Sequence, residues 1–181
     1  MPRKADPNLE KVIVGAAIRI LDKRGIEAVT MRDVANAAGT TTPTLYERFV
    51  DRDALLVAVL DFTAYEMAAR MEVTRNVQGM CEVFLDYCIE FPNRLDLVHK
   101  VWPRTVDADR KRPTYDLAVE RLIKQHEHTK RNAEEIAQSL MAVLLGSVLM
   151  MVGAGIKTKF SDDTRRRALK SIKKLCEGLT A

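Results

Sequence analysis

The stretch TMRDVANAAGTTTPTLYERF, residues 30–49, contains two short helical patterns separated by a single glycine. Thr30 is a suitable N-cap for the first helix, because its hydroxyl can accept a hydrogen bond from an unpaired backbone N–H, and Asp33 completes an acidic capping box. Gly39 then supplies the backbone freedom that a tight turn needs. This spacing predicts a hairpin of two helices.

The second helix of this hairpin follows the turn at once. Thr41 or Thr42 can cap it, and Pro43 falls in the first turn, where a missing N–H costs nothing. Leu45 and Phe49 are four residues apart and should face the core, whereas Tyr46 can face either way. The side chains expected to point outward are Thr42, Thr44, Glu47 and Arg48.

Small hydroxyls, an acid and a guanidinium on one helix face can contact both phosphates and base edges in a major groove. The hairpin therefore favours helix-turn-helix DNA binding over a helical hairpin in some other all-α protein. We expect Arg48 to reach bases and Arg52 to contact phosphates, with Arg3, Lys4 and Arg32 also in reach of the backbone. The full set of predicted DNA-binding residues is Thr30, Arg32, Thr41, Thr42, Pro43, Thr44, Tyr46, Glu47, Arg48 and Arg52.

The stretch from about 9 to 60 resembles the DNA-binding domain of the TetR family of transcriptional regulators. A first amphipathic helix, LEKVIVGAAIRILDKRG, precedes TMRDVANAAG, TTPTLYERF and VDRDALLVAVL in the order and spacing of the family. Val50 stands where many members carry a lysine, and Glu47 where an aromatic or neutral residue is common. The resemblance implies a DNA-binding domain over 1–50 and a helical effector-binding and dimerisation domain over 51–181.

Charge and composition set limits on the partners. The chain has 181 residues and a net charge of +4, but residues 1–60 hold nine Lys or Arg against eight Asp or Glu. DNA affinity must therefore come from the placement of a few cations and from dimerisation. The near-neutral charge favours the alternative of a small-molecule-binding or interaction protein with a vestigial headpiece. The first ten residues lack the apolar core of a secretory signal, so we expect a cytoplasmic protein.

The remainder of the chain has helical periodicity and no long alternating strand pattern, which predicts an all-α fold. Helices are expected over about 51–73, 76–91, 93–101, 114–130, 133–154 and 162–178, the last capped by Ser161 or Asp162. The apolar stretch 136–156 is interrupted by glycines and polar residues, which favours a buried helix over a membrane span.

The helix expected over 133–154 carries apolar residues on more than one face, with Gly146 and Ser147 permitting close approach of another helix. In proteins that resemble TetR, the last two helices form a four-helix bundle with a second subunit. This implies a homodimer, which would present two recognition helices to a palindromic DNA operator. The predicted interface residues are Met141, Leu145, Leu149, Leu169 and Ile172.

Helices between 51 and 130 would enclose the ligand pocket of the family. Met and aromatic residues at helical spacing are also typical of an ordinary core, so both interpretations stay open for most of them. Trp102 lies beside Pro103 at a helix end, where a large amphipathic ring commonly borders a cavity. The predicted lining residues are Tyr65, Met80, Phe84, Tyr87, Cys88, Phe91, Trp102 and Tyr115, and they favour an apolar or aromatic effector.

No phosphate loop, nucleophile elbow or zinc-protease motif is present, so we expect neither an enzyme nor a cofactor. His126 and His128 are two residues apart and would point about 200° apart on a helix, which excludes joint metal binding. Cys81 and Cys88 are too far apart along a helix for a disulfide. Three scattered cysteines are typical of a reducing compartment, and thiol sensing stays open.

Overall fold

A computed structural model describes residues 7–105, 110–126 and 128–178, and this part of the chain is helical with no strand. The all-α prediction is confirmed. The chain packs into two compact units: Met1–Thr63 with Phe91–Arg110, and Ala64–Glu90 with Lys111–Ala181. The boundary predicted at residue 50 separates functions rather than packing units, and it stays a prediction.

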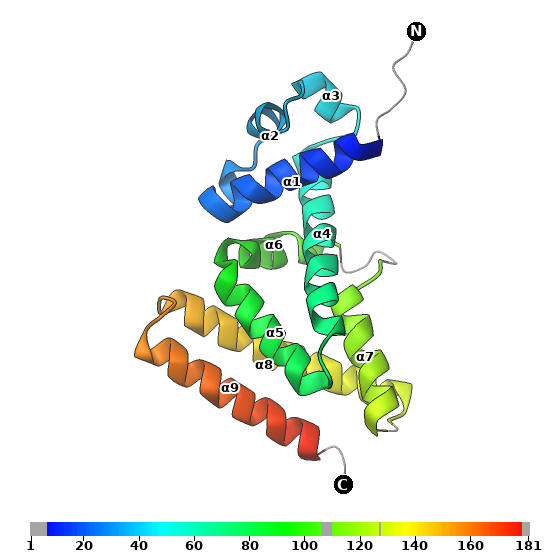
Figure 1. Ribbon diagram of the computed structural model, residues 1–181, viewed down its shortest axis with the longest axis vertical. Helices are drawn as coiled ribbons and strands as arrows, with labels where there is room; N and C mark the ends of the chain where they lie inside the picture. The colour runs from blue at the N-terminus through cyan, green and yellow to red at the C-terminus, as the bar shows by residue number, and fades with distance from the viewer. Residues whose placement is uncertain (1–6, 106–109, 127, 179–181) are drawn as a thin grey trace. The chain divides into compact units, whose positions relative to one another are not determined.

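The first unit is built around the long helix α1 and the short helices that follow it (Figure 1). Ile13, Leu21, Val34 and Leu45 are almost completely buried in its core. The elements of this unit are α1 (Pro7–Arg24), η1 (Ile26–Ala28), α2 (Met31–Ala37), α3 (Thr42–Tyr46), the first part of α4 (Arg52–Glu72), η2 (Pro92–Arg94), α6 (Leu95–Lys100) and η3 (Trp102–Arg104).

Residues 91–104 belong to this unit because apolar and polar contacts both attach them to it. Leu97 and Val101 are buried in the same core as α1. Arg94 forms a bidentate ion pair with Asp22 near the end of α1, with Nε–Oδ1 and Nη2–Oδ2 distances of 2.8 and 2.7 Å. Asn93 donates to the Asp22 carbonyl. The sequence predicted helical material here but not these contacts.

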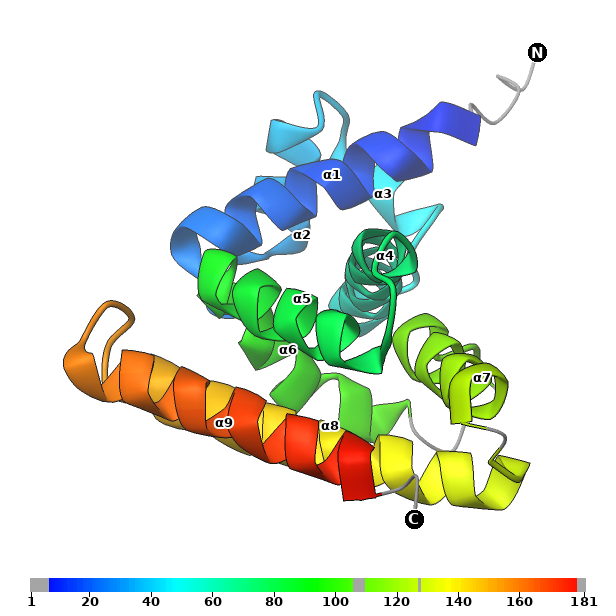
Figure 2. The same cartoon turned by 60° about the horizontal axis from the view of Figure 1, so that its bottom comes forward.

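The second unit contains the rest of α4 with α5 (Val77–Glu90), α7 (Pro113–His126), α8 (Lys130–Gly153) and α9 (Lys159–Gly178). Figure 2 shows α8 and α9 running side by side in opposite directions, with α5 packed across them. The Arg121 guanidinium on α7 donates to the carbonyls of Met71, Glu72 and Thr74. Arg121 therefore supplies donors to backbone carbonyls at and just beyond the end of α4.

Local capping fixes the helix starts and corrects two of the predicted ones. Asp51 accepts from the Ala54 N–H as expected for α4. Helix α8 begins at Lys130 rather than 133, because Thr129 caps it. Helix α9 begins at Lys159, and the Thr158 hydroxyl accepts from the Ser161 N–H. The prediction that Ser161 or Asp162 caps this helix was wrong, since both lie inside it.

Helix α8 has the length and mean hydropathy, 2.0, of a membrane span, but only 39% of its most apolar window is buried within this chain. One face packs against α5, α7 and α9. The buried residues of that face are Ala133, Ile136, Ala137, Leu140, Leu144, Val148 and Met151. The opposite face of the helix keeps apolar residues that this chain does not cover.

Candidate nucleic-acid interface and effector cavity

The turn between α2 and α3 is held by two backbone hydrogen bonds that close the end of α2. Gly39 donates to Asn36 and Thr40 donates to Ala35, at 3.2 and 3.0 Å. Gly39 has a φ of +67°, a conformation that favours glycine. The pattern is a Schellman motif, which reverses the chain within a few residues. The predicted role of Gly39 is therefore present in the structure.

Both helices of the hairpin are capped as the sequence predicts. The Thr30 hydroxyl accepts from the Asp33 N–H at 3.1 Å and donates to the Asp33 carboxylate. The Thr41 hydroxyl accepts from the Thr44 N–H at 3.3 Å, which makes Thr41 the cap of α3. These local bonds fix the direction in which α3 leaves the turn.

The outward face of the hairpin carries most of the predicted DNA-binding residues. Leu45 and Phe49 are buried beneath it, as expected. Thr30, Arg32, Thr41, Pro43, Tyr46 and Glu47 are exposed, and Thr42, Thr44 and Arg48 are partly exposed. Among the described residues, neither Arg32 nor Arg48 forms an ion pair, so both cations face solvent or a ligand. Arg3 and Lys4 lie outside the described residues.

The Arg52 guanidinium bonds to residues of its own unit, and the phosphate contact predicted for it stays a prediction. Its Nε donates to the Val29 carbonyl at 2.7 Å and its Nη2 donates to the Ile26 carbonyl at 2.6 Å. The guanidinium also lies 3.8 Å from the Glu27 carboxylate. Arg52 therefore fastens the start of α4 to the segment before α2. The sequence hides this role because the bonded residues are more than 20 positions apart.

Comparison with known proteins agrees with this geometry. Residues 13–59 match the family of bacterial regulatory proteins called the tetR family. This part of the chain is therefore similar to the DNA-binding part of the TetR family. The matched segment covers most of α1, then η1, α2, the turn, α3 and the first part of α4. No curated protein sequence is significantly similar to the chain.

Solved structures show that the TetR fold extends over the whole chain. A TetR variant from Acinetobacter baumannii AYE, in complex with minocycline, has a TM-score of 0.72 at 18% identity and covers 97% of this chain and 96% of its own. The TetR SCO7222 from Streptomyces coelicolor has a TM-score of 0.73 at 16% identity, with coverages of 94% and 97%. BioQ with its double-stranded DNA operator has a TM-score of 0.64 at 21% identity, with coverages of 95% and 98%.

The second unit of this TetR-like chain encloses an apolar cavity between α4, α5, α7 and α8. No Asp, Glu, Lys or Arg lines it. Its volume in this conformation is about 30 Å³, close to that of one water molecule, whereas ligand pockets usually have about 300–1,000 Å³. The lining residues are Met71, Val77, Met80, Cys81, Phe84, Thr114, Tyr115, Ala118, Ala137, Leu140, Met141 and Leu144.

Three of the eight predicted pocket residues, Met80, Phe84 and Tyr115, line this cavity. Tyr87 and Cys88 are buried in the same unit but do not line it, and the side chain of Tyr65 is 52% exposed. Phe91 and Trp102 belong to the first unit. The sequence therefore located the helices that form the cavity better than the side chains that point into it.

Several cavity residues were missed because their signal in the sequence is that of an ordinary core. Small residues Ala118 and Ala137 line the cavity, and they leave space that a larger side chain would fill. Met141, predicted to contact a second subunit, lines the cavity and is also partly exposed, so that contact stays a prediction. No residue spacing separates these two roles, since both need an apolar side chain on α8.

The outward face of α8 is apolar and open. Leu149 and Met150 are about half exposed, at 54% and 52%. A Cβ placed on Gly146 would meet nothing within 4 Å, so another helix can approach there closely. Leu145 and Leu169 are partly exposed and remain compatible with an interface. Ile172 is not, because it is completely buried within its own chain.

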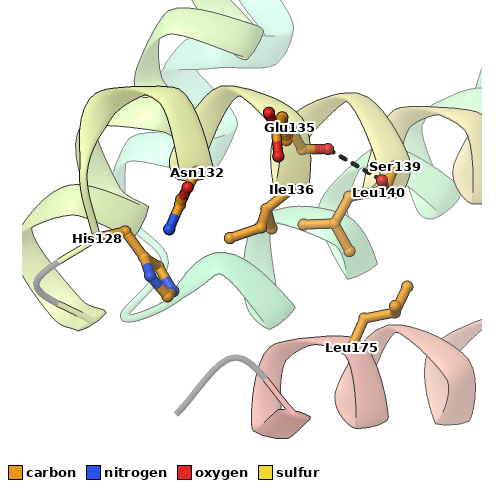
Figure 3. Close-up of a pocket in the computed structure, with 7 residues that line it drawn as sticks. All are labelled: His128, Asn132, Glu135, Ile136, Ser139, Leu140 and Leu175. Carbon is orange, nitrogen blue, oxygen red and sulfur yellow. Dashed lines mark hydrogen bonds between the residues drawn. The ribbon is translucent and has the colours of Figure 1, made fainter. Parts of the chain in front are cut away.

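A polar groove lies at the amino-terminal end of α8, next to α9. Figure 3 shows its side chains coming from the start of α8, with Leu175 of α9 opposite them. The Ser139 hydroxyl is already bonded to the Glu135 carbonyl at 2.9 Å. Its lining residues are His128, Asn132, Glu135, Ile136, Ser139, Leu140 and Leu175. Two of these residues, Ile136 and Leu140, also belong to the buried face of α8, and no pattern in the sequence indicated the groove.

The cysteines are separate from these surfaces except for Cys81, which lines the cavity. Burial raises the pKa of the Cys81 and Cys88 thiols to about 12. Both therefore stay protonated at neutral pH, and a protonated thiol is a poor nucleophile. Cys176 is partly exposed. Among the described residues, no group of His, Cys, Asp and Glu side chains could hold a metal ion.

Proposed function

We propose that this protein is a cytoplasmic transcriptional repressor that binds a palindromic DNA operator as a homodimer and is released by a small apolar or aromatic effector. The observation that carries DNA binding is the capped hairpin of α2 and α3. In this hairpin Arg32 and Tyr46 are exposed and Thr42, Thr44 and Arg48 are partly exposed, and neither arginine forms an ion pair with a described residue. A helix presented in this way suits insertion into a major groove.

Selection of bound duplexes from a random pool tests DNA binding directly. A homodimer should enrich a palindrome, because its two-fold symmetry repeats the contact in both half-sites. Arg48→Ala should relax the preference at one base position in each half-site, at a cost of about 1–3 kcal/mol. Arg32→Ala is the matched control: it should weaken binding to every sequence alike and reduce the salt slope by about one.

The same experiment separates DNA binding from the alternative function. If no sequence is enriched and the salt dependence is weak, the hairpin is vestigial. The chain is then a small-molecule-binding or interaction protein. The near-neutral charge of residues 1–60 is the observation that favours this second candidate.

Homodimer formation is supported by the apolar outward face of α8 and by exposed apolar side chains on α9. Phe160 and Leu175 lie on α9 and are 50% and 38% exposed. The other side of α9 packs against α8 and α5. Exposed apolar side chains on two neighbouring helices are typical of a contact with another protein. A second copy has the same surface and can cover it by two-fold symmetry.

Effector binding is supported by the uncharged cavity of the second unit, which would have to open to admit a ligand. Met71, Met80 and Met141 line it, and unbranched methionine side chains adapt easily to a new shape. An apolar ligand without a formal charge fits the lining, since a charged one would be buried without a partner. DNA and effector should then weaken each other's binding by the same factor, typically about 5–150-fold.

The neutral apolar dye Nile red is a suitable probe of this cavity. We expect blue-shifted fluorescence with the native protein and its loss in Ala118→Phe, which fills the space between α7 and α8. Ala69→Phe, on the exposed face of α4, is the matched control and should leave binding unchanged. Equal binding by both variants would place the dye outside the cavity.

A further inference from the structure

Helix α9 has one face packed on its own unit and an opposite face that is strongly cationic. Ser161, Ala168 and Ile172 are buried and define the inner face. The exposed cations on the opposite side are Lys159, Arg166, Arg167, Lys170, Lys173 and Lys174. This face is separate from the helix-turn-helix hairpin, which belongs to the other packing unit.

The concentration of charge on this helix dominates the charge of the whole protein. Helix α9, Lys159–Gly178, contains seven Lys or Arg against two Asp and one Glu, a net charge of +4, which equals the net charge of the whole chain. All other residues together therefore carry no net charge. The basic character of this protein comes from one helix and not from its proposed DNA-reading surface.

Three cations of this face have no acidic partner among the described residues, whereas two neighbouring arginines each form an ion pair. Arg165 is paired with Asp86, and Arg166 with Asp163. Within the described ranges, Arg167, Lys170 and Lys174 form no ion pair or hydrogen bond with a side chain. Elsewhere on the second unit, Lys124, Lys130 and Arg131 are equally exposed, but each has an acidic partner one turn away on its helix.

The spacing of these three cations suits a polyanion with regular charges. Positions 167, 170 and 174 lie on one helix face and extend over about 10.5 Å along the axis. The phosphates of one DNA strand rise by about 3.4 Å each, so this length corresponds to about three phosphates. A contact of this type would follow the DNA backbone without reading bases.

The composition of the face discriminates between classes of partner. Protein interfaces are enriched in aromatic side chains and depleted in lysine at their centre, and no apolar anchor lies between these cations. A helix that binds a membrane surface needs a continuous exposed apolar face, whereas the inner apolar residues of α9 are buried and its exposed apolar side chains, Phe160 and Leu175, lie near its two ends. A phosphate backbone needs only accessible cations at a suitable spacing.

We propose that the outward face of α9, defined by Arg167, Lys170 and Lys174, binds the backbone of a second DNA segment without sequence preference. The inference rests on the proposed function, because it takes DNA to be the polyanion that this protein meets. One molecule bound to its operator would then hold another stretch of duplex through α9.

A two-duplex capture experiment tests this. A biotinylated duplex carrying the selected operator is saturated with the full chain and washed, and a fluorescent 60-base-pair duplex of random sequence is added at about 50 mM salt. The native protein should retain the fluorescent duplex, since low salt strengthens backbone contacts. The triple variant Arg167→Gln, Lys170→Gln, Lys174→Gln should retain at least tenfold less while occupying the operator equally.

The matched control removes the same charge from the paired cations. The triple variant Lys124→Gln, Lys130→Gln, Arg131→Gln should retain the second duplex as the native protein does. Equal loss in both variants would show an effect of net charge alone, and equal retention in all three proteins would show that α9 is not used. Either result overturns the proposal, as does the absence of a second duplex with the native protein.

A second measurement keeps this inference distinct from the proposed function. The affinity of the full chain for the random duplex is measured against salt, with no operator present. The α9 variant should lower the slope of log affinity against log salt by about 2.7, from three lost phosphate contacts. An unchanged slope overturns the α9 proposal, whereas failure to select any operator overturns only the proposed function. If polyglutamate displaces the duplex at a lower concentration of charges than unlabelled duplex does, the α9 face binds an acidic protein rather than DNA.

Discussion

Asp22 and Arg94 form the ion pair with the least exposed side chains among the described residues. The Arg94 side chain is 7% exposed and that of Asp22 is 25% exposed. The Arg94 guanidinium also stacks on the Phe91 ring, 3.9 Å from its centroid. The pair fastens the segment before α6 to the end of α1. A guanidinium in this environment needs its carboxylate, because burying it alone is costly.

Asp22→Ala should therefore destabilise the first unit by about 3 kcal/mol, because it removes the bidentate carboxylate partner of the buried Arg94 guanidinium. Denaturant unfolding followed by circular dichroism measures this loss. Asp163→Ala is the control, since it breaks the exposed pair with Arg166 and should cost at most about 1 kcal/mol. Similar losses for both variants would mean that the Arg94 charge is accommodated in another way.

Residues whose partners are near in sequence were predicted well, and those with distant partners were not. Thr30, Thr41 and Asp51 cap helices through bonds spanning three positions, which a sequence pattern reveals. Arg52 and Arg94 have partners 23 to 72 positions away. A surface cation and a buried one look alike in the sequence until the fold brings a carbonyl or carboxylate beside them.

The raised thiol pKa values lead to a prediction about cysteine reactivity. At pH 8 the Cys81 and Cys88 thiols, with pKa values near 12, should be almost fully protonated in the folded protein. A thiol reagent should thus modify Cys176 first and the other two only after unfolding. Mass spectrometry of the partly modified protein identifies the site. Rapid native modification of Cys81 would mean that the cavity opens readily.

At the scale of elements, Arg121 joins α7 to the end of α4, and Gln125 donates to the Arg75 carbonyl just beyond it at 2.6 Å. Arg121 donates to the Thr74 carbonyl and hydroxyl at 2.8 and 2.6 Å, in addition to the Met71 and Glu72 carbonyls. Helix α7 also supplies Thr114, Tyr115 and Ala118 to the cavity wall. A displacement of α7 by a ligand would therefore act directly on the last turn of α4.

Arg121→Ala should loosen that turn while leaving the rest of the unit folded. We expect faster hydrogen exchange at the amides of residues 69–75 and a loss of stability of about 1–2 kcal/mol, because several charge-assisted hydrogen bonds disappear. Lys124→Ala, three positions along the same helix, is the control and should leave these amides unchanged. Uniformly faster exchange throughout the second unit would indicate global destabilisation instead.

The positions of the helices were predictable from the sequence, but which face of each helix is buried was only partly predictable. Apolar periodicity located α5 and α8, and Pro92 correctly marked the end of α5. On α8, however, Met141 and Leu149 have the same apolar character and opposite environments, one lining the cavity and the other exposed. Because α8 has apolar residues on several faces, its helical periodicity does not show which face packs within this chain and which is left for another chain.

At the scale of the whole molecule, the outward face of α8 should decide the oligomeric state. Leu149→Arg would place a charge in the proposed two-fold contact, where it would be buried without a partner. We expect a folded monomer by sedimentation, with the helical circular dichroism retained and operator affinity lost.

Val73→Arg is the matched control for this variant. Val73 is the most exposed large apolar residue described, at 85%. It directly follows the last residue of α4 and is not part of α8 or α9. This variant should remain a dimer and bind the operator. A dimer in both variants would place the subunit contact on another surface.

The chain passes between its two packing units three times, after residues 63, 90 and 110. The first crossing falls inside α4, and no loop, glycine or proline interrupts the helix there. The sequence alone predicts a domain boundary near residue 50, just before α4 begins, because the hairpin motif ends there. It does not show that Leu97 and Val101 complete the core of the first unit.

This threefold crossing limits how such a regulator can be recombined with its relatives. A hybrid that exchanges only residues 1–50 would pair a headpiece from one parent with Leu97, Val101 and Arg94 from another, at contacts that must fit to within one methyl group. A hybrid that exchanges 1–63 together with 91–110 keeps that core from a single parent. Its joint inside α4 must also preserve helical phase, since one added residue turns everything beyond it by 100°. New DNA specificities on this body are therefore more accessible through substitutions on α3 than through exchange of a cassette.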